Sequence, residues 1–453
     1  MYFRTLLAVA VAAVPTILAI PGYADEAADI RAIREEIKAL EERMKNAESA
    51  LPSKSAPAGA GSSGILGSNA FNPAMSLILS GQINHLERDP ATYGIGGFIP
   101  GGGEIGPGER SFNLGESELT ISANIDPYFS GKFVMAAGPE GGAEVEEAYA
   151  QNSGAIPGTT LRFGRFLSGI GYLNEIHAHA WDFVDAPLVH QAFFGGALKE
   201  DGAQVRWLAP APVFLEFGIE TGRGANFPGT DRNKNGLNGG MLFAHVGDDV
   251  GAGGSYRMGA SYRKTRALDR QYQDINSLDQ TVINAFEGDN KIWAVDLVWK
   301  WSPNGNPVER NFKLQTEYFR REEAGRLTYD VDGTSTPGTG TDRYASKQSG
   351  WYAQAVYQFM PRWRAGMRYE TLSSGTVENS LVSNNVNGLT ASDFPLLAAN
   401  KPKRATVMMD FSVSEFSRLR LQFARDQARF NVTDNQIVLQ YVMSLGAHGA
   451  HTF

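Results

Sequence analysis

The stretch QIVLQYVMSLGAHGAHTF, residues 436–453, decides the fold that we predict for this chain. Ile437, Leu439, Tyr441 and Met443 share one face of a β-strand, and mostly polar residues share the other. A half-apolar strand at the end of a chain would form an exposed edge, which invites aggregation. Pairing it with the first strand would remove the edge and close a barrel. We therefore expect a closed barrel; an edge strand of a soluble β-protein is the alternative.

Sixteen candidate strands follow one another from Ala74 onward, where the hydrophobic pattern changes to a period of two. They begin near Ala74, Ser111, Tyr128, Glu144, Thr159, Asp201, Val213, Gly239, Ser255, Lys291, Phe312, Gly350, Arg362, Arg404, Ser417 and Gln436. Several of these candidate strands alternate regularly between apolar and polar residues. Between residues 291 and 301, the predicted outward set is Trp293, Val295, Leu297 and Trp299.

The connections between these strands alternate between long and short through most of the chain. The long ones are 86–110, 168–200, 222–238, 265–290, 322–349 and 372–403. Outer-membrane barrels have this asymmetry, together with an even number of strands. No segment after the N-terminus is apolar enough for a transmembrane helix, and only helices and closed barrels satisfy every backbone group in lipid. We therefore predict an all-β fold, a 16-stranded antiparallel transmembrane β-barrel over residues 74–453.

Three segments precede the predicted barrel. Residues 1–24 combine a positive residue, an apolar run and small residues at the end, which is typical of a secretory signal peptide. Residues 25–51 carry an unbroken heptad pattern with Ile30 and Ile37 among the core positions, which predicts a short periplasmic coiled-coil helix. A single amphipathic helix lying on another surface is the alternative. Residues 52–73 are rich in Pro, Ala, Gly and Ser and predict a flexible linker.

The composition excludes several kinds of site. The chain has no cysteine, so thiolate metal sites and disulfide bonds are excluded. The sequence contains no phosphate-binding loop, dinucleotide-binding motif or zinc-protease motif. We therefore expect neither an enzyme nor a cofactor, and no nucleic-acid partner.

Charged residues at inward positions of the strands are the candidate pore-lining residues, because a pore works through the side chains that face its lumen. They are Arg257, Arg263, Arg362, Arg364, Arg368, Arg404, Arg418 and Arg420, with the acids Glu216, Glu220, Asp296, Glu317, Glu370, Asp410 and Asp426 opposing them. The last arginines come from consecutive strands and predict one basic stripe. Because arginine suits carboxylates, sulfate and phosphate, we expect a pore that leans toward small anions. The alternative is that these residues only pair with one another across the lumen.

The long connection 168–198 carries a second group of candidate residues, expected at a constriction of the pore. They are His177, His179, Asp182, Asp185 and His190. Imidazole and carboxylate could bind a divalent metal, but His-x-His is an unspecific spacing, so we predict no metal site here. The same holds for His448 and His451, because a terminus after a strand has little around it to complete a coordination sphere.

The signal peptide, short coiled coil, Gly/Ser linker, 16-strand barrel and terminal Phe453 together resemble trimeric Gram-negative outer-membrane porins, specifically the phosphate-selective porin-like group with an N-terminal coiled coil. The most specific local match is LRFGRF, residues 161–166, a strand leading into the connection 168–198. The resemblance implies that this connection is a third external loop that folds inward and narrows the pore. It also implies that the barrel-assembly machinery recognises the C-terminal strand. The acids and histidines of the loop depart from the Lys- and Arg-rich pores of phosphate-selective members.

The expected function is therefore passive diffusion of small hydrophilic solutes or ions through a water-filled channel in the outer membrane of a Gram-negative bacterium. The alternative is an envelope-tethering or adhesive protein that uses the barrel only as an anchor in the lipid. We also expect a homotrimer, because isoleucine at both core positions of the first heptad disfavours a dimer.

Overall fold

The structure is a computed structural model that describes residues 73–102, 105–138, 142–154, 156–231 and 233–446. The predicted signal peptide, the predicted coiled-coil helix, the linker up to residue 72 and the chain after residue 446 lie outside these described residues.

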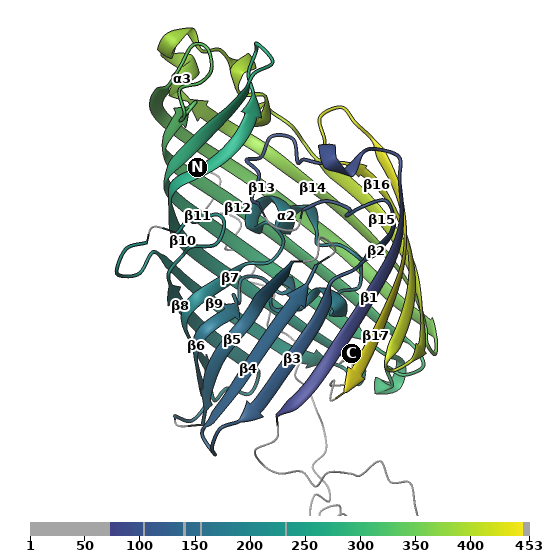
Figure 1. Cartoon of the computed structure of the whole chain (residues 1–453). Coiled ribbons are helices and arrows are strands. Elements are labelled where there is room, and N and C mark those ends of the chain that lie inside the picture. The colour runs from purple at the N-terminus through teal and green to yellow at the C-terminus, as the bar shows by residue number, and fades with distance from the viewer. Residues whose placement is uncertain (1–72, 103–104, 139–141, 155, 232, 447–453) are drawn as a thin grey trace, which may run out of the picture. The chain divides into compact units, whose positions relative to one another are not determined.

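Seventeen strands within the described residues form one antiparallel sheet that closes on itself (Figure 1). They are β1 (Ala74–Leu86), β2 (Ser111–Leu114), β3 (Ser117–Asn124), β4 (Phe129–Ala137), β5 (Ala143–Ser153), β6 (Thr159–Leu167), β7 (Lys199–Leu208), β8 (Phe214–Gly222), β9 (Gly239–Val250), β10 (Gly254–Ile275), β11 (Thr281–Trp301), β12 (Asn311–Tyr329), β13 (Gly340–Met360), β14 (Trp363–Asn379), β15 (Lys403–Ser414), β16 (Ser417–Gln427) and β17 (Asp434–Gly446). Because β2 and β3 both pair with β1, they are two halves of one interrupted strand. In the described residues the barrel therefore has sixteen antiparallel strands, as predicted.

The closing strand pairs with the first one, as predicted. The antiparallel register of β1 and β17 runs from Ser76 opposite Gly446 to Leu86 opposite Gln436, and the two strands lie side by side in Figure 1. No strand edge is therefore left open between the two ends of the sheet, which removes the edge that a C-terminal strand would otherwise expose.

The barrel is apolar outside and polar inside. On β17, Leu439 and Tyr441 are 40% and 36% exposed, whereas Gln436 and Gln440 between and beside them are 4% and 6% exposed. The pattern extends around the barrel, because many large hydrophobic side chains are exposed and many charged ones are buried. A soluble protein distributes these classes the other way round.

Two of the predicted long loops are instead continuations of strands. Residues 265–275 and 281–290 pair with each other as the outer parts of β10 and β11, and residues 322–329 and 340–349 do the same in β12 and β13. The reason lies in an apolar cluster on this extension, where Tyr272, Phe286, Leu327, Tyr344 and Phe394 are buried together. Packing in this cluster stabilises the tall hairpins beyond the main ring of strands.

The helices of the described residues are short and lie in the connections. They are η1 (Pro90–Thr92), η2 (Leu173–Glu175), η3 (Ala178–Ala180), α2 (Leu188–Phe194), η4 (Pro303–Gly305), α3 (Ser380–Ser383), η5 (Val386–Gly388), η6 (Ala391–Asp393) and η7 (Pro395–Leu397). Among the described residues, no helix has both the length and the apolarity to cross a membrane.

Candidate functional site

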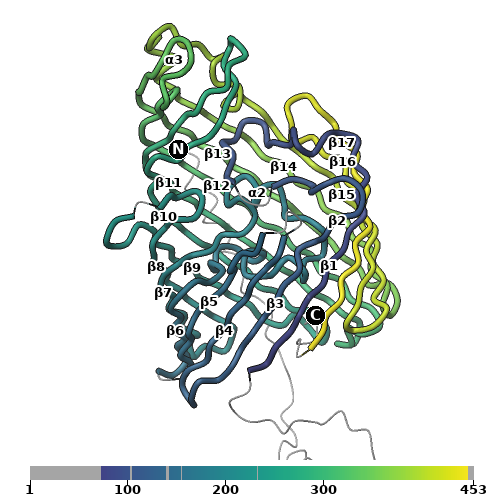
Figure 2. The backbone as a smooth tube through the Cα atoms, viewed as in Figure 1, coloured from purple at the N-terminus to yellow at the C-terminus, as the bar shows by residue number. Residues whose placement is uncertain are grey.

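The connection between β6 and β7, residues 168–198, folds into the barrel, and we call it the inner loop. It contains η2, η3 and α2, and α2 lies within the ring of strands in Figures 1 and 2. All seven residues of α2 are buried. The inward fold that the resemblance implied for this segment is therefore what the structure has.

The base of the inner loop is closed by one asparagine. The side-chain amide of Asn174 donates to the carbonyls of Ser168 and Leu198, at 2.7 and 2.9 Å, and its oxygen accepts from the Leu198 amide at 2.7 Å. Because Ser168 and Leu198 are the two ends of the loop, these bonds hold the ends together at the barrel wall. Asn174 itself is buried, so the bonds are protected from water.

Three buried glutamates on the barrel wall accept hydrogen bonds from the inner loop. Glu220 on β8 accepts from the Ser168 hydroxyl at 2.7 Å and from the Gly169 amide at 2.8 Å. Glu317 on β12 accepts from His190 Nε2 at 2.8 Å and also from the Tyr172 amide. The third, Glu370 on β14, accepts from the Leu188 amide at 2.5 Å, at the start of α2. Several separate parts of the loop are thus fastened to the wall.

Five arginines of β14, β15 and β16 face the inner loop, and we call these five residues the basic stripe. Five of the predicted arginines, from β14, β15 and β16, bind loop carboxylates or carbonyls: Arg364, Arg368, Arg404, Arg418 and Arg420. Their partners on the loop are the side chains of Asp182 and Asp185 and the carbonyls of His179, Trp181, Asp185 and Ala186. The stripe therefore holds the loop, and two of its members, Arg364 and Arg418, also line a cavity.

Ion pairs also connect the stripe to acids on the same strands. Arg364 pairs with Asp410 at 2.6 Å, and Arg404 pairs with Glu370 at 2.8 Å. Both pairs join neighbouring strands of the barrel wall, β14 and β15.

The other predicted pore-lining residues have different surroundings. Arg362 lies in the turn between β13 and β14, where it is exposed, so it is not part of the stripe. Buried Arg263 pairs with Glu200 at 3.0 Å. Asp296 is buried beside Gly259, on the neighbouring strand.

A small network joins two more of the predicted wall residues, Glu216 and Arg257, through His245. Glu216 accepts from His245 at 2.8 Å, and the other ring nitrogen of His245 lies 2.7 Å from the Arg257 guanidinium. This network is separate from the stripe on β14, β15 and β16.

A cluster of imidazoles and carboxylates lies where the inner loop meets β3 and β5, and sequence analysis identified only its histidines. His177 contacts Glu146 and Glu147 on β5, and Glu118 on β3 lies close to both His177 and His179. The two consecutive glutamates face the same way because β5 has a bulge. Val134 of β4 lies opposite Glu147, and the next residue of β4 lies opposite Val145. Glu146 therefore has no residue opposite it on β4.

Two cavities lie against the inner loop. The loop-side cavity, of about 740 Å³, is lined by Glu144, Glu146, His177, Asp185 and Lys199 among others. The turn-side cavity, of about 570 Å³, reaches the short turn between β15 and β16 and is lined by Lys300, Lys313, Arg364 and Arg418 among others. Ile176 lines both, so the inner loop separates them.

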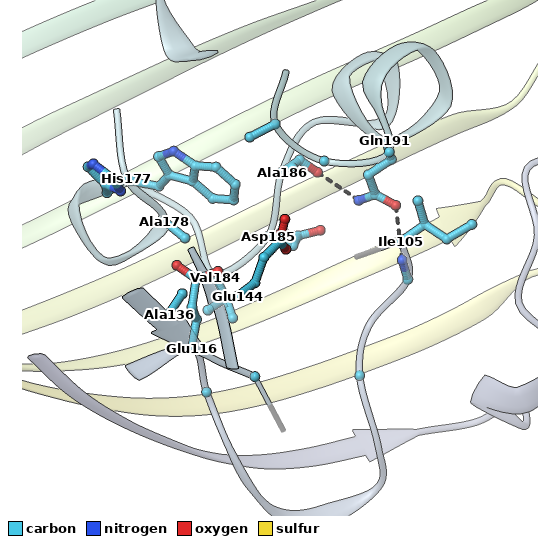
Figure 3. Close-up of a pocket in the computed structure, with 18 of the residues that line it drawn as sticks. Ile105, Glu116, Ala136, Glu144, His177, Ala178, Val184, Asp185, Ala186 and Gln191 are labelled. Carbon is cyan, nitrogen blue, oxygen red and sulfur yellow. Dashed lines mark hydrogen bonds between the residues drawn. The ribbon is translucent and has the colours of Figure 1, made fainter. Parts of the chain in front are cut away.

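Figure 3 shows how the loop-side cavity is built. The side chain of Gln191 on α2 donates to the Ala186 carbonyl at 2.8 Å and accepts from the Gly106 amide at 3.1 Å. Gln191 thereby connects the inner loop to the first long connection. His177 and Asp185 approach the same space from the inner loop, and Glu144 approaches it from β5.

The charges of the inner loop are set by their neighbours. Burial alone would raise the pKa of Asp185, but the guanidinium groups of Arg404 and Arg368 outweigh it and lower that pKa to about 2. Lys313 and Arg364 act in the same way on Asp182, whose pKa is also lowered. Burial alone would lower the pKa of His177, but Glu146, Glu147 and Glu118 raise it to about 10. Both aspartates are therefore anions near neutral pH, and His177 is a cation.

Comparison with known proteins gives one clear relative and a shared fold. No protein-family model matches this chain. An uncharacterized protein of Aquifex aeolicus (strain VF5) is 33% identical over 418 residues, which cover 85% of this chain and 80% of that protein.

Two solved structures of outer membrane proteins are similar to this chain. A loop L8 deletion mutant of OmpT, an outer membrane protein of Vibrio cholerae, aligns with a TM-score of 0.50 and 11% identity, over 83% of this chain and all of that one (100%). The outer membrane channel DcaP of Acinetobacter baumannii aligns with a TM-score of 0.48 and 12% identity, over 82% and 97%. The likeness to the Vibrio protein shows a common barrel fold. On the strength of the Aquifex match, this chain belongs to the same protein family as that uncharacterized protein of Aquifex aeolicus.

Proposed function

We propose that the protein is a porin in the outer membrane of a Gram-negative bacterium, where it lets small hydrophilic solutes diffuse passively. The observation that carries this proposal is the distribution of side chains, which are apolar on the outside of the barrel and polar on the inside. Outward side chains such as Leu439 and Trp293 are apolar and exposed, and the lumen holds charged groups and two cavities. Such a surface is stable in lipid, and a closed barrel leaves no backbone group unpaired there.

The proposed pore leans toward anions, and the turn-side cavity supports this. Its charged lining consists of Arg257, Lys300, Lys313, Arg364 and Arg418 against Glu175, Asp182 and Glu415. The loop-side cavity has the opposite balance, with Glu116, Glu144, Glu146 and Asp185 against Lys199 and His177. A solute that crosses the barrel would therefore meet an acidic vestibule and a basic one in series, and the basic one adjoins the short turns.

Planar-bilayer recordings test the proposal directly. The purified protein should insert and give discrete conductance steps, and the zero-current potential across a KCl gradient should show a modest preference for chloride. A clear preference for potassium would contradict the proposed anion preference but would still agree with the proposal that the protein is a channel. Absence of any steps from correctly folded barrels would contradict the channel.

One observation favours the second candidate function, an anchor barrel for an envelope-tethering or adhesive protein. The inner loop lies between the two cavities, and many of its polar groups are bonded to the wall. A barrel closed in this way would hold a partner-binding segment in the membrane without conducting. The same recordings separate the two functions, because an anchor barrel should give no conductance steps.

The proposed assembly is a homotrimer that the barrel-assembly machinery inserts through the C-terminal strand. Its support is the heptad pattern of residues 25–51 and the length of the linker that follows. A flexible tether of this length lets helices from separate barrels meet, and it raises their effective concentration once the barrels associate.

A further inference from the structure

The imidazole–carboxylate cluster beside the inner loop has the composition of a metal site. Its members are Glu118, Glu146, Glu147, His177 and His179, which come from β3, β5 and the inner loop. The three glutamates and His179 are all less than a tenth exposed. None of them belongs to the basic stripe, although Arg418 of the stripe binds the His179 carbonyl.

Three atoms of this cluster already have the spacing of metal ligands. His177 Nδ1 lies 3.0 Å from Glu146 Oε2 and 3.2 Å from Glu118 Oε2, and all three atoms lie within 4.8 Å of one another. Around a tetrahedral ion with bonds of about 2.0–2.2 Å, ligand atoms are roughly 3.3–3.6 Å apart. The two distances from His177 Nδ1 are a few tenths of an ångström shorter than this spacing.

The second ring nitrogen of His177 has the partner that metal-bound histidines usually have. His177 Nε2 lies 2.9 Å from Glu147 Oε2, and Glu147 in turn pairs with Lys132. A carboxylate at this position fixes the tautomer and the orientation of a ligating imidazole. Nδ1 is thereby left facing Glu118 and Glu146.

Two further features complete the site. Glu146 and His177 line the loop-side cavity, so an ion or a water ligand can reach them. His179 Nδ1 lies 3.1 Å from the same Glu118 oxygen and is a candidate fourth ligand.

The charge of the cluster also suits a cation. Three carboxylates face the ammonium groups of Lys132 and Lys199, and Lys199 is shared with Glu144 at 3.0 Å. The two ammonium groups leave one carboxylate to be balanced. The neighbouring glutamates raise the pKa of His177 to about 10, so its proton supplies that charge, and a bound ion must displace the proton.

We propose that Glu118, Glu146 and His177 bind a divalent transition-metal ion of the zinc type, which ties the inner loop to β3 and β5. One imidazole and two carboxylates match zinc better than calcium or magnesium, which take oxygen ligands. The site does not depend on the proposed channel, because an anchor barrel would bind the ion equally well.

Titration calorimetry with zinc chloride tests the site on the full-length protein in detergent. We expect one ion per chain with a Kd of about 1 μM or tighter. Glu146→Gln and His177→Gln should each weaken binding at least about tenfold, because each removes one of three ligands. Heat-modifiable migration on gels would show that both variants still form the barrel. A wild-type protein that takes up no zinc at concentrations up to about 1 mM would overturn the proposal.

Two controls keep the assignment specific. Glu144→Gln changes a carboxylate on the same strand that lies outside the ligand trio, and it should leave zinc binding unchanged. The double variant His448→Gln/His451→Gln removes the two C-terminal imidazoles and should also bind normally. If binding disappears in this double variant and persists in His177→Gln, the ion is held elsewhere and the proposed site is wrong.

Discussion

Asp185 of the inner loop and Arg404 of β15 form an ion pair inside the barrel, with Oδ2 and Nη1 2.6 Å apart and the guanidinium side chain 1% exposed. Arg368 binds the other oxygen of Asp185 at 2.8 Å, and Glu370 accepts from both arginines. Two cations and two anions are thereby arranged so that each has partners of opposite charge. The arrangement fastens this part of the inner loop to β14 and β15.

Removal of the Asp185 carboxylate should release the inner loop from the arginines that hold it. In Asp185→Ala, two buried guanidinium groups lose a partner, and breaking a buried pair typically costs about 3–5 kcal/mol. We expect larger and noisier single-channel conductance, because the loop no longer holds its position. Arg362→Ala changes an exposed arginine in a turn and should conduct like the wild type. Unchanged conductance in a folded Asp185→Ala barrel would show that other contacts suffice to hold the loop.

The same aspartate predicts the acid sensitivity of the loop. Its pKa is lowered to about 2, compared with about 3.9 for an unperturbed aspartate. A lowered pKa stabilises the folded loop fully above the unperturbed value, and that stabilisation is lost as the pH falls through about 2. Conductance should therefore stay level from pH 7 to about 4 and rise below it, and Asp185→Ala should lack the rise. A large change between pH 6 and 5 would assign control to another group.

Selectivity can be tested on one strand with a matched pair. Lys300 lines the turn-side cavity, whereas Lys291 on the same strand points outward. Lys300→Gln removes a positive charge from the basic vestibule, so the zero-current potential in a KCl gradient should shift toward potassium. Lys291→Gln removes the same charge from the outer surface and should leave the potential unchanged, because solvent ions screen exposed charges. Equal shifts in both variants would contradict a local effect of the vestibule.

The barrel could be predicted from the sequence because each strand shows its own alternation of apolar and polar residues. Alternation along one strand decides which face is apolar, and a slip of one residue would invert every side chain. Trp293 and Val295 therefore point outward as predicted. The basic stripe followed from the same rule, because inward positions of consecutive strands are neighbours.

The partners of the stripe could not be predicted in the same way. The pairing of Asp185 with Arg404 depends on how a long loop folds back into the barrel, which no periodicity encodes. The bulge in β5 breaks the alternation rule itself, because it turns Glu146 and Glu147 to the same side. The tall hairpins were predicted as loops, although an apolar cluster that includes Tyr344 stabilises them as strands.

The predicted coiled coil can be tested apart from the barrel. Ile33→Asp with Ile37→Asp places charges in the heptad core and should disrupt a three-helix assembly. We expect the trimer to weaken and the barrel to persist, measured by native mass spectrometry in detergent and by heat-modifiable migration. Ala28→Asp would add a charge in the same segment at a position outside the predicted core and serves as the control. A monomeric wild-type protein would contradict the trimer whatever the helix does.

The outer surface of the barrel gives the sharpest test of the proposed membrane location, because the cost of a charged residue depends on its depth in the bilayer. Leu439 lies near the middle of β17 and Leu445 near its end, and both side chains are exposed on the outer face. In a membrane barrel, arginine costs about 2–4 kcal/mol at the midplane and about 0–1 kcal/mol near the interface. Leu439→Arg should therefore lower the free energy of unfolding in phospholipid vesicles strongly, and Leu445→Arg should lower it little, as measured by urea titration. If the outer face were in contact with water, both substitutions would be nearly neutral, and the proposed membrane location would be wrong.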